Sequence, residues 1–327
     1  MKKKFAIGID IGGTNTVFGF VDETGNCIHE SSISTCAEQN ADQLFEKLFA
    51  AINKSIEKIG NEFEIVGIGI GAPNGNYYKG TVEQPPNLNW GTVNVLDIVK
   101  KYSPLPSAIT NDANAAAIGE MIFGAAKEMK NFIVITLGTG LGSGLVVNGE
   151  LVYGSDGFAG EIGHTIVDPN GRECGCGRKG CLETYASATG IRRTVFELIG
   201  TTNIPSKLRD VCFNNLTARE IADAATRGDK LALAAFDHTA KILGLKLADT
   251  VAHLSPEAII LFGGLALSGS LIFEPTKRYM EEYMLNIFKN KVKILPSALP
   301  GAHAAVLGAG ALIWNELKKS YLHKTIK

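Results

Sequence analysis

The sequence has no apolar run that approaches the roughly 20 residues required for a membrane-spanning helix. Lysines occupy positions 2 to 4, but Asp10 soon interrupts the apolar stretch that follows them. A secretory signal peptide needs an apolar core of about 7–15 residues and a cleavage site with small residues. We therefore expect a cytoplasmic protein that has no membrane partner.

An excess of charge of one sign is also missing. The chain has 32 Lys and Arg residues against 33 Asp and Glu residues, which gives a formal net charge of −1. Proteins that bind nucleic acids broadly need clustered positive charge to neutralise the phosphates. We therefore expect no nucleic-acid partner.

Two common nucleotide-binding motifs are absent from the sequence. No G-x-x-x-x-G-K-[ST] loop is present, which argues against a P-loop fold. The Gly12-Gly13-Thr14 segment lacks the further spaced glycine and the strand-to-helix context of a dinucleotide site. A nucleotide would therefore have to bind through another arrangement.

The composition and the residue patterns predict an α/β protein of two domains. Hydrophobic residues make up 45% of the 327 residues, and domains contain about 150 residues on average. Strand patterns alternate with helical spacing, and no low-complexity linker separates the halves, so we expect two closely apposed domains. The first expected elements are strands over 5–11, 16–21, 28–34 and 65–70 and an amphipathic helix over 41–59.

The second half of the chain repeats the pattern of the first. Residues 11–14 align with residues 137–140, and in both places a glycine-rich turn joins two expected strands. A later strand over 258–262 ends in Gly263-Gly264, as the strand over 65–70 ends in Gly71. We therefore expect a duplicated sheet core, with further helices over 231–253 and 304–319.

The two glycine-tipped hairpins are suited to bind the phosphates of a nucleotide from both sides of a cleft. Glycines allow backbone N–H groups to approach phosphate oxygens, and Asp10 is placed to hold a hydrated Mg²⁺. One such turn alone is more often only a tight hairpin, but the duplication together with Asp10 favours the phosphate role. The arrangement resembles the actin-like ATPase superfamily. Hydroxyl groups that can add donors belong to Thr14, Thr16, Thr139 and Ser143.

Asp112 follows a short expected strand and precedes an alanine-rich helix. A single aspartate at such a transition is usually a helix cap. The functional alternative is a general base, which accepts the proton of a hydroxyl group as its oxygen attacks a γ-phosphate.

Three of the six cysteines, Cys174, Cys176 and Cys181, lie within eight residues and follow His164. Three thiolates and one imidazole form a closed tetrahedral set for a structural Zn²⁺ ion. Cys174 and Cys176 are too close to form a comfortable disulfide. His164 is either a zinc ligand or only a sugar contact. We expect ordinary thiols at Cys27, Cys36 and Cys212, and a helix-start residue at His303.

Glu161 and Glu183 flank this cysteine loop. Either glutamate alone would be interpreted as a surface residue. A metal-ordered loop would hold both carboxylates in fixed positions, and rigid acceptors suit the vicinal hydroxyl groups of a sugar. We therefore favour sugar binding by both residues.

Together these motifs resemble the ROK family, which contains bacterial sugar kinases and sugar-responsive repressors. The resemblance extends over nearly the whole chain. The segments that carry it are residues 10–14, 71–73, 86–88, 111–115, 136–142, 161–164 and the cysteine loop through Glu183.

The resemblance implies a two-domain actin-like ATPase (ribonuclease H-like) fold with an interdomain cleft. The smaller domain would cover 1–112 plus 309–327, and the larger domain, with the zinc loop, 113–308. The last helix would return to the first domain, and the protein would form a homodimer.

The resemblance also implies the cofactors ATP, Mg²⁺ and structural Zn²⁺. Asp112 would be the catalytic base. The implied sugar-binding residues are Gly71, Asn87, Asn111, Asp112, Glu161, His164 and Glu183. The implied ATP-binding residues are Asp10, Gly12, Gly13, Thr14, Thr16, Gly138, Thr139, Gly140, Gly263 and Gly264. The implied zinc ligands are His164, Cys174, Cys176 and Cys181.

The implied function is that of an ATP-dependent hexose kinase, and first of all a glucokinase that phosphorylates the sugar 6-hydroxyl. An N-acetylmannosamine kinase and a fructokinase are the alternatives. Asn74 stands where family members often have glycine, and this difference alters the sugar pocket expected near Pro73. The sequence therefore does not decide which hexose binds. A repressor would need a helix-turn-helix segment before the strand expected from Phe5, and a chaperone-like ATPase would need a peptide-binding domain.

Overall fold

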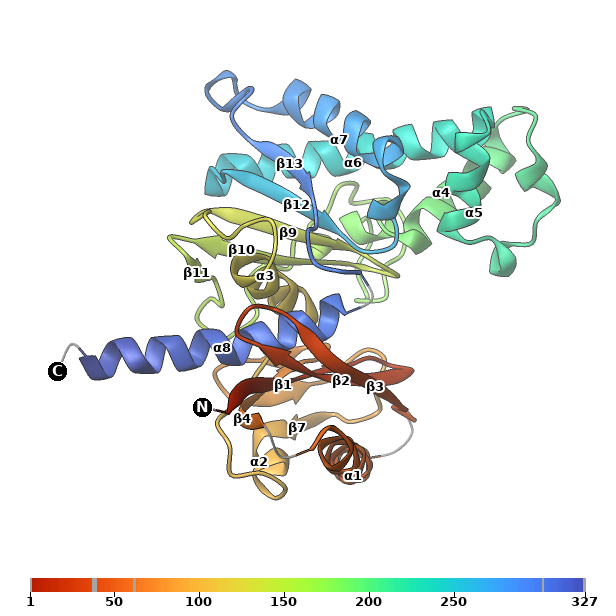
Figure 1. Ribbon diagram of the computed structural model, residues 1–327. Coiled ribbons are helices and arrows are strands. Elements are labelled where there is room, and N and C mark those ends of the chain that lie inside the picture. Colours follow the sequence, from red (N-terminus) through yellow and green to blue (C-terminus); the bar gives the residue numbers. More distant parts are fainter. Residues whose placement is uncertain (1, 37–39, 61–62, 302, 326–327) are drawn as a thin grey trace. The chain divides into compact units, whose positions relative to one another are not determined.

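The computed structural model describes residues 2–36, 40–60, 63–301 and 303–325, with side chains described up to residue 320. The remaining residues of the chain, which the expected domains include, lie outside these described ranges. The chain forms two compact units, whose elements are labelled in Figure 1. The first unit consists of Met1–Met129, Leu151–Ala159 and Ala298–Lys327, and the second consists of Lys130–Glu150 and Gly160–Ser297.

The first unit is built on a five-stranded sheet with the order β3-β2-β1-β4-β8. β1, β2 and β3 pair in antiparallel fashion, whereas β4 and β8 continue the sheet in parallel. A small antiparallel sheet has the order β5-β6-β7. The elements are β1 (Lys3–Ile11), β2 (Asn15–Asp22), β3 (Cys27–Ser34), α1 (Ala41–Ile59), β4 (Phe63–Gly71), β5 (Gly75–Asn76), β6 (Thr81–Glu83), β7 (Thr92–Asn94), α2 (Val95–Lys100), β8 (Ser107–Thr110), α3 (Asp112–Ile122) and α8 (Ala304–Thr325).

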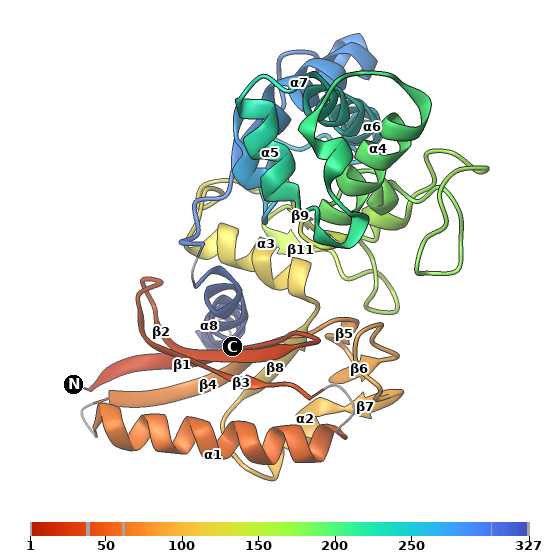
Figure 2. The same cartoon turned by 90° about the vertical axis from the view of Figure 1, so that its right-hand side faces the viewer.

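Helices cover both faces of this sheet, with α1 on one side and α3 and α8 on the other (Figure 2). Alternate residues of β1, including Phe5, Ile7 and Ile9, are buried in one core with the apolar face of α1. Asn40 starts α1, because its side chain accepts a hydrogen bond from the backbone N–H of Gln43. The helix that the apolar spacing predicts over 41–59 therefore has the same limits in the structure.

The last helix, α8, lies close to the sheet because the strands carry glycine where it crosses them. A Cβ atom on Gly8 would collide with the carbonyl group of Val306, and one on Gly69 with the carbonyl group of Ala309. Gly308 allows a similar approach to α3, because a Cβ atom there would lie 2.7 Å from the Ala115 carbonyl oxygen. These close contacts hold α8 within the first unit, where the resemblance places it.

The second unit has a five-stranded sheet in the corresponding order, β11-β10-β9-β12-β13. β9 and β10 form an antiparallel hairpin, and β12 and β13 continue in parallel. The duplicated sheet core is thus confirmed. The elements, with short 3₁₀ helices labelled η, are β9 (Phe132–Leu137), β10 (Leu141–Val147), β11 (Glu150–Leu151), η1 (Ile162–His164), η2 (Leu182–Thr184), α4 (Ala188–Thr201), η3 (Lys207–Asp210), η4 (Phe213–Asn215), α5 (Ala218–Thr226), α6 (Lys230–Leu254), β12 (Ala258–Phe262), η5 (Ala266–Ser268), α7 (Ser270–Tyr283), η6 (Asn286–Phe288) and β13 (Lys293–Pro296).

One hydrophobic core joins the helices of the second unit to its sheet. Ile133, Ile259 and Leu243 are among its fully buried members. Within it α6 packs closely on α7, because Gly244 leaves no room for a side chain beside the backbone of Met280. This core shares no element with the sheet of the first unit.

The compact units divide the chain differently from the expected domains. Residues 113–129, 151–159 and 298–308 were expected in the larger domain, but all three segments belong to the first unit. The cause is the contact between α3 and α8, in which a Cβ atom on Gly119 would lie 3.1 Å from the Cα atom of Gly308. This contact between distant segments has no signal in the local sequence.

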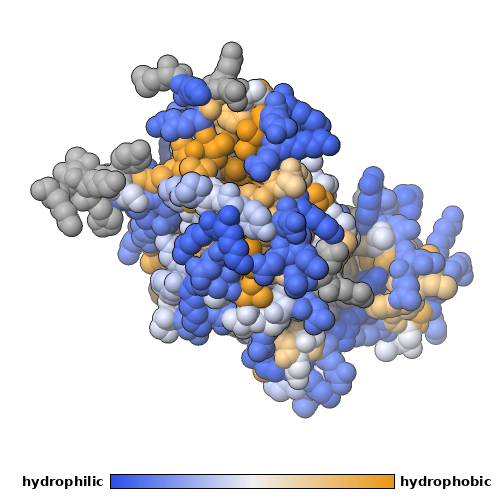
Figure 3. Space-filling view, turned by 90° about the horizontal axis from the view of Figure 1, so that it is seen from below, coloured by the Kyte–Doolittle hydropathy of each residue, from blue (hydrophilic) through white to orange (hydrophobic). Residues whose placement is uncertain are grey.

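The outer surface of the first unit is polar where its helices face solvent. Hydrophilic side chains dominate the surface over α1 and α2 (Figure 3). Of the helices within the described ranges, none combines the length and the hydropathy needed to cross a membrane.

Candidate functional site

The carboxyl ends of three parallel strands bring two aspartates together in the first unit. Asp10 lies near the end of β1, Gly71 ends β4, and Asp112 follows β8 as the first residue of α3. The backbone register pairs Asp10 with Gly71. A Cβ atom on Gly71 would lie 3.6 Å from Oδ1 of Asp10 and 3.9 Å from the Cα atom of Asp112. These three residues therefore form one cluster.

Asn111, rather than Asp112, caps helix α3. Oδ1 of Asn111 accepts a hydrogen bond from the backbone N–H of Asn114 at 2.6 Å. The carboxylate of Asp112 accepts the N–H of the next residue, Ala113, at 2.8 Å, and its side chain is exposed to solvent. The helix-cap interpretation of Asp112 is therefore wrong, and Asn111 has a structural task in addition to its expected sugar contact.

The surroundings raise the pKa values of both aspartates. Protein atoms displace water around Asp10, and the negative charge of Asp112 adds to this effect, so that the pKa of Asp10 rises to about 7. Although part of Asp112 is exposed, neighbouring protein atoms crowd its carboxylate, and this burial raises its pKa, whereas the N–H of Ala113 opposes the rise. Two carboxylates that repel each other fit a divalent cation, which would remove the repulsion. The pair is thus suited to Mg²⁺ and to general-base chemistry.

The hairpin between β1 and β2 places the first glycine-rich turn beside a second expected site loop. The N–H of Gly12 donates to the carbonyl oxygen of Asn15 at 3.0 Å and closes the turn, and Thr14 is exposed at its tip. A Cβ atom on Gly13 would lie 2.8 Å from the Cβ atom of Asn87. The tip therefore lies against the loop between β6 and β7 that carries Asn87.

Two hydroxyl groups that were expected to face phosphates are structural instead. Thr16 is fully buried, and its Oγ1 lies 2.9 Å from Oγ1 of Thr35. Ser143 is also buried; its hydroxyl donates to the carbonyl oxygen of Gly160 and accepts the N–H of Ile162. Both side chains point into the protein, so they support the hairpins from within.

In the second unit, Glu183 connects the second glycine hairpin to the cysteine loop. Oε2 of Glu183 accepts the N–H of Leu141 at 2.9 Å, and a Cβ atom on Gly140 would collide with the same carboxylate. Sγ of Cys174 lies 3.8 Å from Oε1 of Glu183. An expected sugar contact therefore touches both the expected phosphate hairpin and the expected zinc loop.

The remaining glycines of the expected nucleotide site also lie in the second unit. Gly138 and Gly140 close the turn around the exposed Thr139, with a hydrogen bond of 3.0 Å from the N–H of Gly138 to the carbonyl oxygen of Gly140. Gly263 has φ +100°, and a Cβ atom there would lie 2.8 Å from the carbonyl oxygen of Leu137. The Gly263-Gly264 turn therefore lies next to the end of β9, near the second hairpin.

The four expected zinc ligands form one cluster. Their ligand atoms all lie within 4.8 Å of one another. Nδ1 of His164 lies 3.7 Å from Sγ of Cys174, and Sγ of Cys176 lies 3.7 Å from Sγ of Cys181. A tetrahedral Zn²⁺ ion with Zn–S bonds of about 2.3 Å needs sulfur atoms about 3.8 Å apart. The residues therefore fit zinc, and the use of Nδ1 of His164 as a ligand leaves Nε2 for a sugar hydroxyl.

Arg178 assists the ionisation of one thiol in this cluster. Burial opposes the ionisation of Cys176, but the backbone N–H and the side chain of Arg178 outweigh it and lower the pKa of Cys176 to about 6. Burial raises the pKa of Cys174 to about 12. The second thiol would need a bound cation to ionise near neutral pH, which agrees with a metal site.

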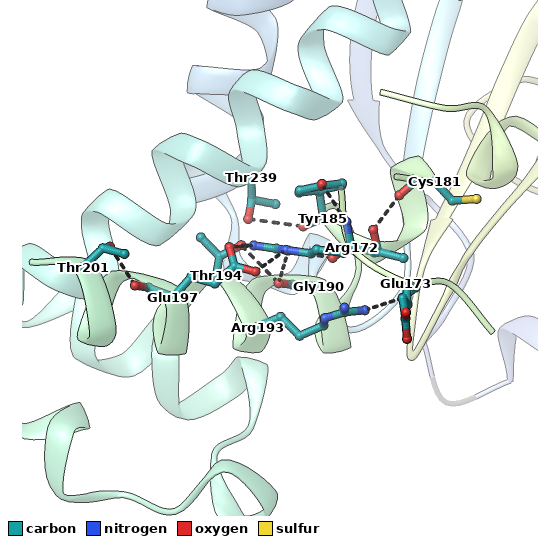
Figure 4. A network of polar contacts seen from close by, with 11 residues as sticks. Arg172, Glu173, Cys181, Tyr185, Gly190, Arg193, Thr194, Glu197, Thr201 and Thr239 are labelled. Carbon is teal, nitrogen blue, oxygen red and sulfur yellow. Dashed lines mark hydrogen bonds and ion pairs between the residues drawn. The ribbon is translucent and has the colours of Figure 1, made fainter. Parts of the chain in front are cut away.

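A buried arginine that the motifs did not single out anchors the loop before the cysteines (Figure 4). Arg172 donates from Nε and Nη2 to the two carboxylate oxygens of Glu197 on α4, at 2.7 and 2.6 Å. Its Nη1 donates to the carbonyl oxygen of Thr184 at 2.6 Å, and its guanidinium lies over the Tyr185 ring at 4.3 Å. Arg172 thereby holds η2, which carries Glu183, against α4.

Comparisons with known proteins agree with this arrangement. A family model described as the ROK family matches residues 6–316. The glucokinase of Halalkalibacterium halodurans is 34% identical, and the match covers 96% of both chains. The xylose repressor of Caldicellulosiruptor bescii is 31% identical over 95% of this chain and 78% of its own length.

A solved structure extends the comparison to three dimensions. The ROK family glucokinase from Streptomyces griseus, in complex with glucose and AMPPNP, matches with a TM-score of 0.80 and 33% identity. The match covers 94% of this chain and 98% of that one. It confirms the expected α/β fold of the actin-like ATPase type. The chain therefore belongs to the ROK family.

Proposed function

We propose that this protein is an ATP-dependent hexose kinase of the glucokinase type, which transfers the γ-phosphoryl group of ATP to the 6-hydroxyl of glucose. The proposal rests on one observation above all. Asp112 is accessible to solvent, has a raised pKa and lies beside Asp10 at the carboxyl ends of parallel strands. The glucokinase relatives, one of them in complex with glucose and AMPPNP, support the choice of substrates.

In the proposed reaction Asp112 accepts the proton of the sugar hydroxyl as its oxygen attacks the γ-phosphorus. The new O–P bond forms while the bond to the β–γ bridging oxygen breaks, and ADP leaves with that electron pair. Asp10 would hold Mg²⁺, which offsets negative charge on the phosphates. The backbone N–H groups of the two glycine hairpins would bind the phosphate oxygens.

The proposed sugar-binding residues are Gly71, Asn87, Asn111, Asp112, Glu161, His164 and Glu183. The zinc ion would act as a structural cofactor, because four protein ligands leave no open coordination position. In this proposal His164 serves both as zinc ligand and as sugar contact.

The test of the proposal is an ADP-release assay with glucose, mannose, fructose, N-acetylglucosamine and N-acetylmannosamine. We expect ADP to form fastest with glucose. Preference for N-acetylmannosamine or fructose would keep the kinase mechanism but change the acceptor. Binding of a sugar without any ADP release would favour a sugar-responsive regulator, a class to which the xylose repressor belongs.

The general base is tested by the variant Asp112→Asn, which keeps the size of the side chain but cannot accept the proton. We expect kcat to fall by about 10²- to 10⁴-fold, while the glucose dissociation constant stays within a few-fold of the wild-type value. The matched control is Asp223→Asn, at an exposed position on α5. Nearly normal turnover by Asp112→Asn would remove Asp112 from the mechanism.

Two further parts of the proposal concern the cell and the assembly. An enzyme that consumes ATP fits a cytoplasmic location. The homodimer that the resemblance implies stays a prediction, and sedimentation equilibrium of the full chain measures it.

A further inference from the structure

A second group of potential metal ligands lies in the first unit, apart from the His164 and cysteine cluster in the second. It consists of Cys27 and Glu30 on β3 and His303 directly before α8. One ligand atom of each residue lies within 4.8 Å of those of the other two. The local sequence predicts only an ordinary thiol at Cys27 and a helix-start residue at His303.

A β-bulge brings Cys27 and Glu30 to the same face of the sheet. In a regular strand, residues three positions apart point to opposite faces. Here Phe20 of β2 pairs with His29, and Val21 pairs with Cys27, so Ile28 is an extra residue that reverses the alternation. His29 points to the α1 side of the sheet, where its Nε2 lies 3.1 Å from Oγ of Ser55.

The neighbouring strand leaves space for the sulfur atom. Gly19 on β2 lies beside Cys27, and a Cβ atom on Gly19 would lie 3.0 Å from Sγ of Cys27 and 2.9 Å from Cγ1 of Val306. Val306 belongs to α8, so the sulfur lies on the face of the sheet that α8 covers. A larger residue at position 19 would push the thiol away from the group.

The other two ligands already face each other. Nδ1 of His303 lies 2.7 Å from Oε2 of Glu30, although the residues are 273 positions apart in the sequence. The side chains of His303 and Glu30 are 41% and 24% exposed. A metal ion could therefore enter from solvent and keep a water molecule as a further ligand.

We propose that Cys27, Glu30 and His303 form a second metal site, which binds a borderline divalent cation such as Zn²⁺. Thiolate and imidazole ligands favour Zn²⁺ or Co²⁺ over Mg²⁺, which prefers oxygen ligands. Three protein ligands and one water molecule would complete a tetrahedral shell. The ion would attach the start of α8 to the bulge of β3, directly after the chain re-enters the first unit at Ala298.

The experiment measures metal content and cobalt spectra of the full-length protein. Wild-type protein and Cys27→Ser are dialysed against the same low concentration of Zn²⁺, and bound zinc is counted per chain. We expect the wild type to hold about one ion more than Cys27→Ser. This difference is independent of the His164 cluster, whose occupancy is measured separately with Cys176→Ser. Failure of that cluster to bind zinc would therefore not be mistaken for failure of this site.

Added Co²⁺ provides the second readout. The wild type should show thiolate-to-cobalt charge-transfer absorption from this site and from the His164 cluster, and the part of the band that comes from this site should disappear in Cys27→Ser and in His303→Gln. The control variant Cys212→Ser, which changes an exposed thiol outside both clusters, should keep the band. Equal zinc content in the wild type and in both ligand variants, or a cobalt band that is as strong in them as in the wild type, would overturn the proposal. Because Cys27 and His303 lie on different segments, a folding defect in one variant leaves the other as a test.

Discussion

Asp10 and Asp112 show how two residues of one charge come to share a site. Their strands, β1 and β8, are parallel neighbours of β4, so the carboxyl ends of the strands meet. Gly71 leaves space there beside the carboxylate of Asp10 and the backbone of Asp112. Burial and, to a smaller extent, the negative charge of Asp112 raise the pKa of Asp10 to about 7, so that without a cation one carboxylate readily binds a proton. Mg²⁺ would replace that proton.

This pair predicts a pH dependence of stability in the absence of Mg²⁺. The pKa of Asp10 is raised from 3.8 to about 7, so the folded protein binds this proton more tightly than the unfolded chain. The tighter proton binding by Asp10 therefore adds to the free energy of unfolding. This added stability is complete below pH 4 and is lost as the pH rises through 7. Urea unfolding of the wild type and of Asp10→Asn between pH 4 and pH 8 measures it as the difference between the two curves.

The same experiment with Mg²⁺ supplies the control. At pH 8 the ion should stabilise the wild type more than Asp10→Asn, since only the wild type has the ionised ligand. Parallel pH curves for the two proteins without metal would contradict the coupling between Asp10 and Asp112.

For single residues, the sequence predicts a functional site when the residues of that site lie close together in the chain. The spacing of Cys174, Cys176 and Cys181 is enough to predict a zinc site, and the structure clusters the expected ligands. The group around Cys27 depends on an extra residue in one strand, and the inward-facing hydroxyls of Thr16 and Ser143 depend on strand register. None of these three features has a sequence signature.

Among the elements, η2 has little structure of its own. It has only three residues and no side-chain cap, yet it carries Glu183 between the glycine hairpin and the cysteine loop. Arg172 holds it through the carbonyl oxygen of Thr184 and the ring of Tyr185. We therefore regard Arg172 as a positioning residue for Glu183.

The variant Arg172→Lys tests this role. Lysine keeps the charge but cannot make the paired hydrogen bonds to Glu197, so we expect the free energy of unfolding to fall by about 2–4 kcal/mol. The KM for glucose should rise, because Glu183 loses its support, whereas the KM for ATP and the zinc content should change little. Steady-state kinetics and urea unfolding give these values.

Arg193→Lys is the matched control for this variant. Arg193 lies on α4, and its Nη1 donates a hydrogen bond to the carbonyl oxygen of Glu173 at 2.8 Å. Its replacement should leave the unfolding free energy within about 0.5 kcal/mol of the wild-type value. No loss in Arg172→Lys would mean that Arg172 acts only through its charge, and an equal loss in both variants would contradict a role specific to Arg172.

The elements themselves were largely predictable. Apolar residues at helical spacing predict the helix over 41–59 and the helix over 231–253, and α1 and α6 match these ranges within one residue. The expected final helix, 304–319, starts correctly but continues to Thr325. Periodicity weakens toward that end of the helix, where the sequence from Lys318 onward is mostly polar.

For the whole molecule, the repeated strand order means that two separate cores must be stabilised. None of the His164 cluster residues belongs to the core of the first unit. The second unit, in contrast, would depend on zinc to order residues 164–183. Loss of zinc from the His164 cluster alone should therefore weaken the second unit selectively.

Calorimetry of the variant Cys176→Ser tests this selectivity. The variant should lose about one zinc ion per chain, because three ligands of the His164 cluster hold the ion far less well than four. We expect the transition of the second unit to move down by about 5 °C or more, while that of the first unit stays in place. Cys36→Ser, at an exposed thiol of the first unit, serves as control. A uniform shift of all unfolding signals would contradict a zinc effect confined to one unit.

The division into two units was predictable from the repeat, but the positions of the boundaries were not. The motifs at 11–14 and 137–140 reveal the duplication. The assignment of α3 and of residues 298–308 to the first unit depends on glycine contacts between segments about 190 residues apart, such as Gly119 with Gly308. Such contacts follow from the fold and cannot be found in a single sequence.

The late position of α8 also has a consequence for biosynthesis. On the ribosome, β1, β4 and β8 emerge early, but the helix that covers Gly8 and Gly69 is translated last. The part of this sheet face that α8 covers must therefore stay exposed while the whole second unit is made. Chaperones that shield apolar surfaces during translation should consequently bind the growing chain until residues beyond 304 leave the exit tunnel.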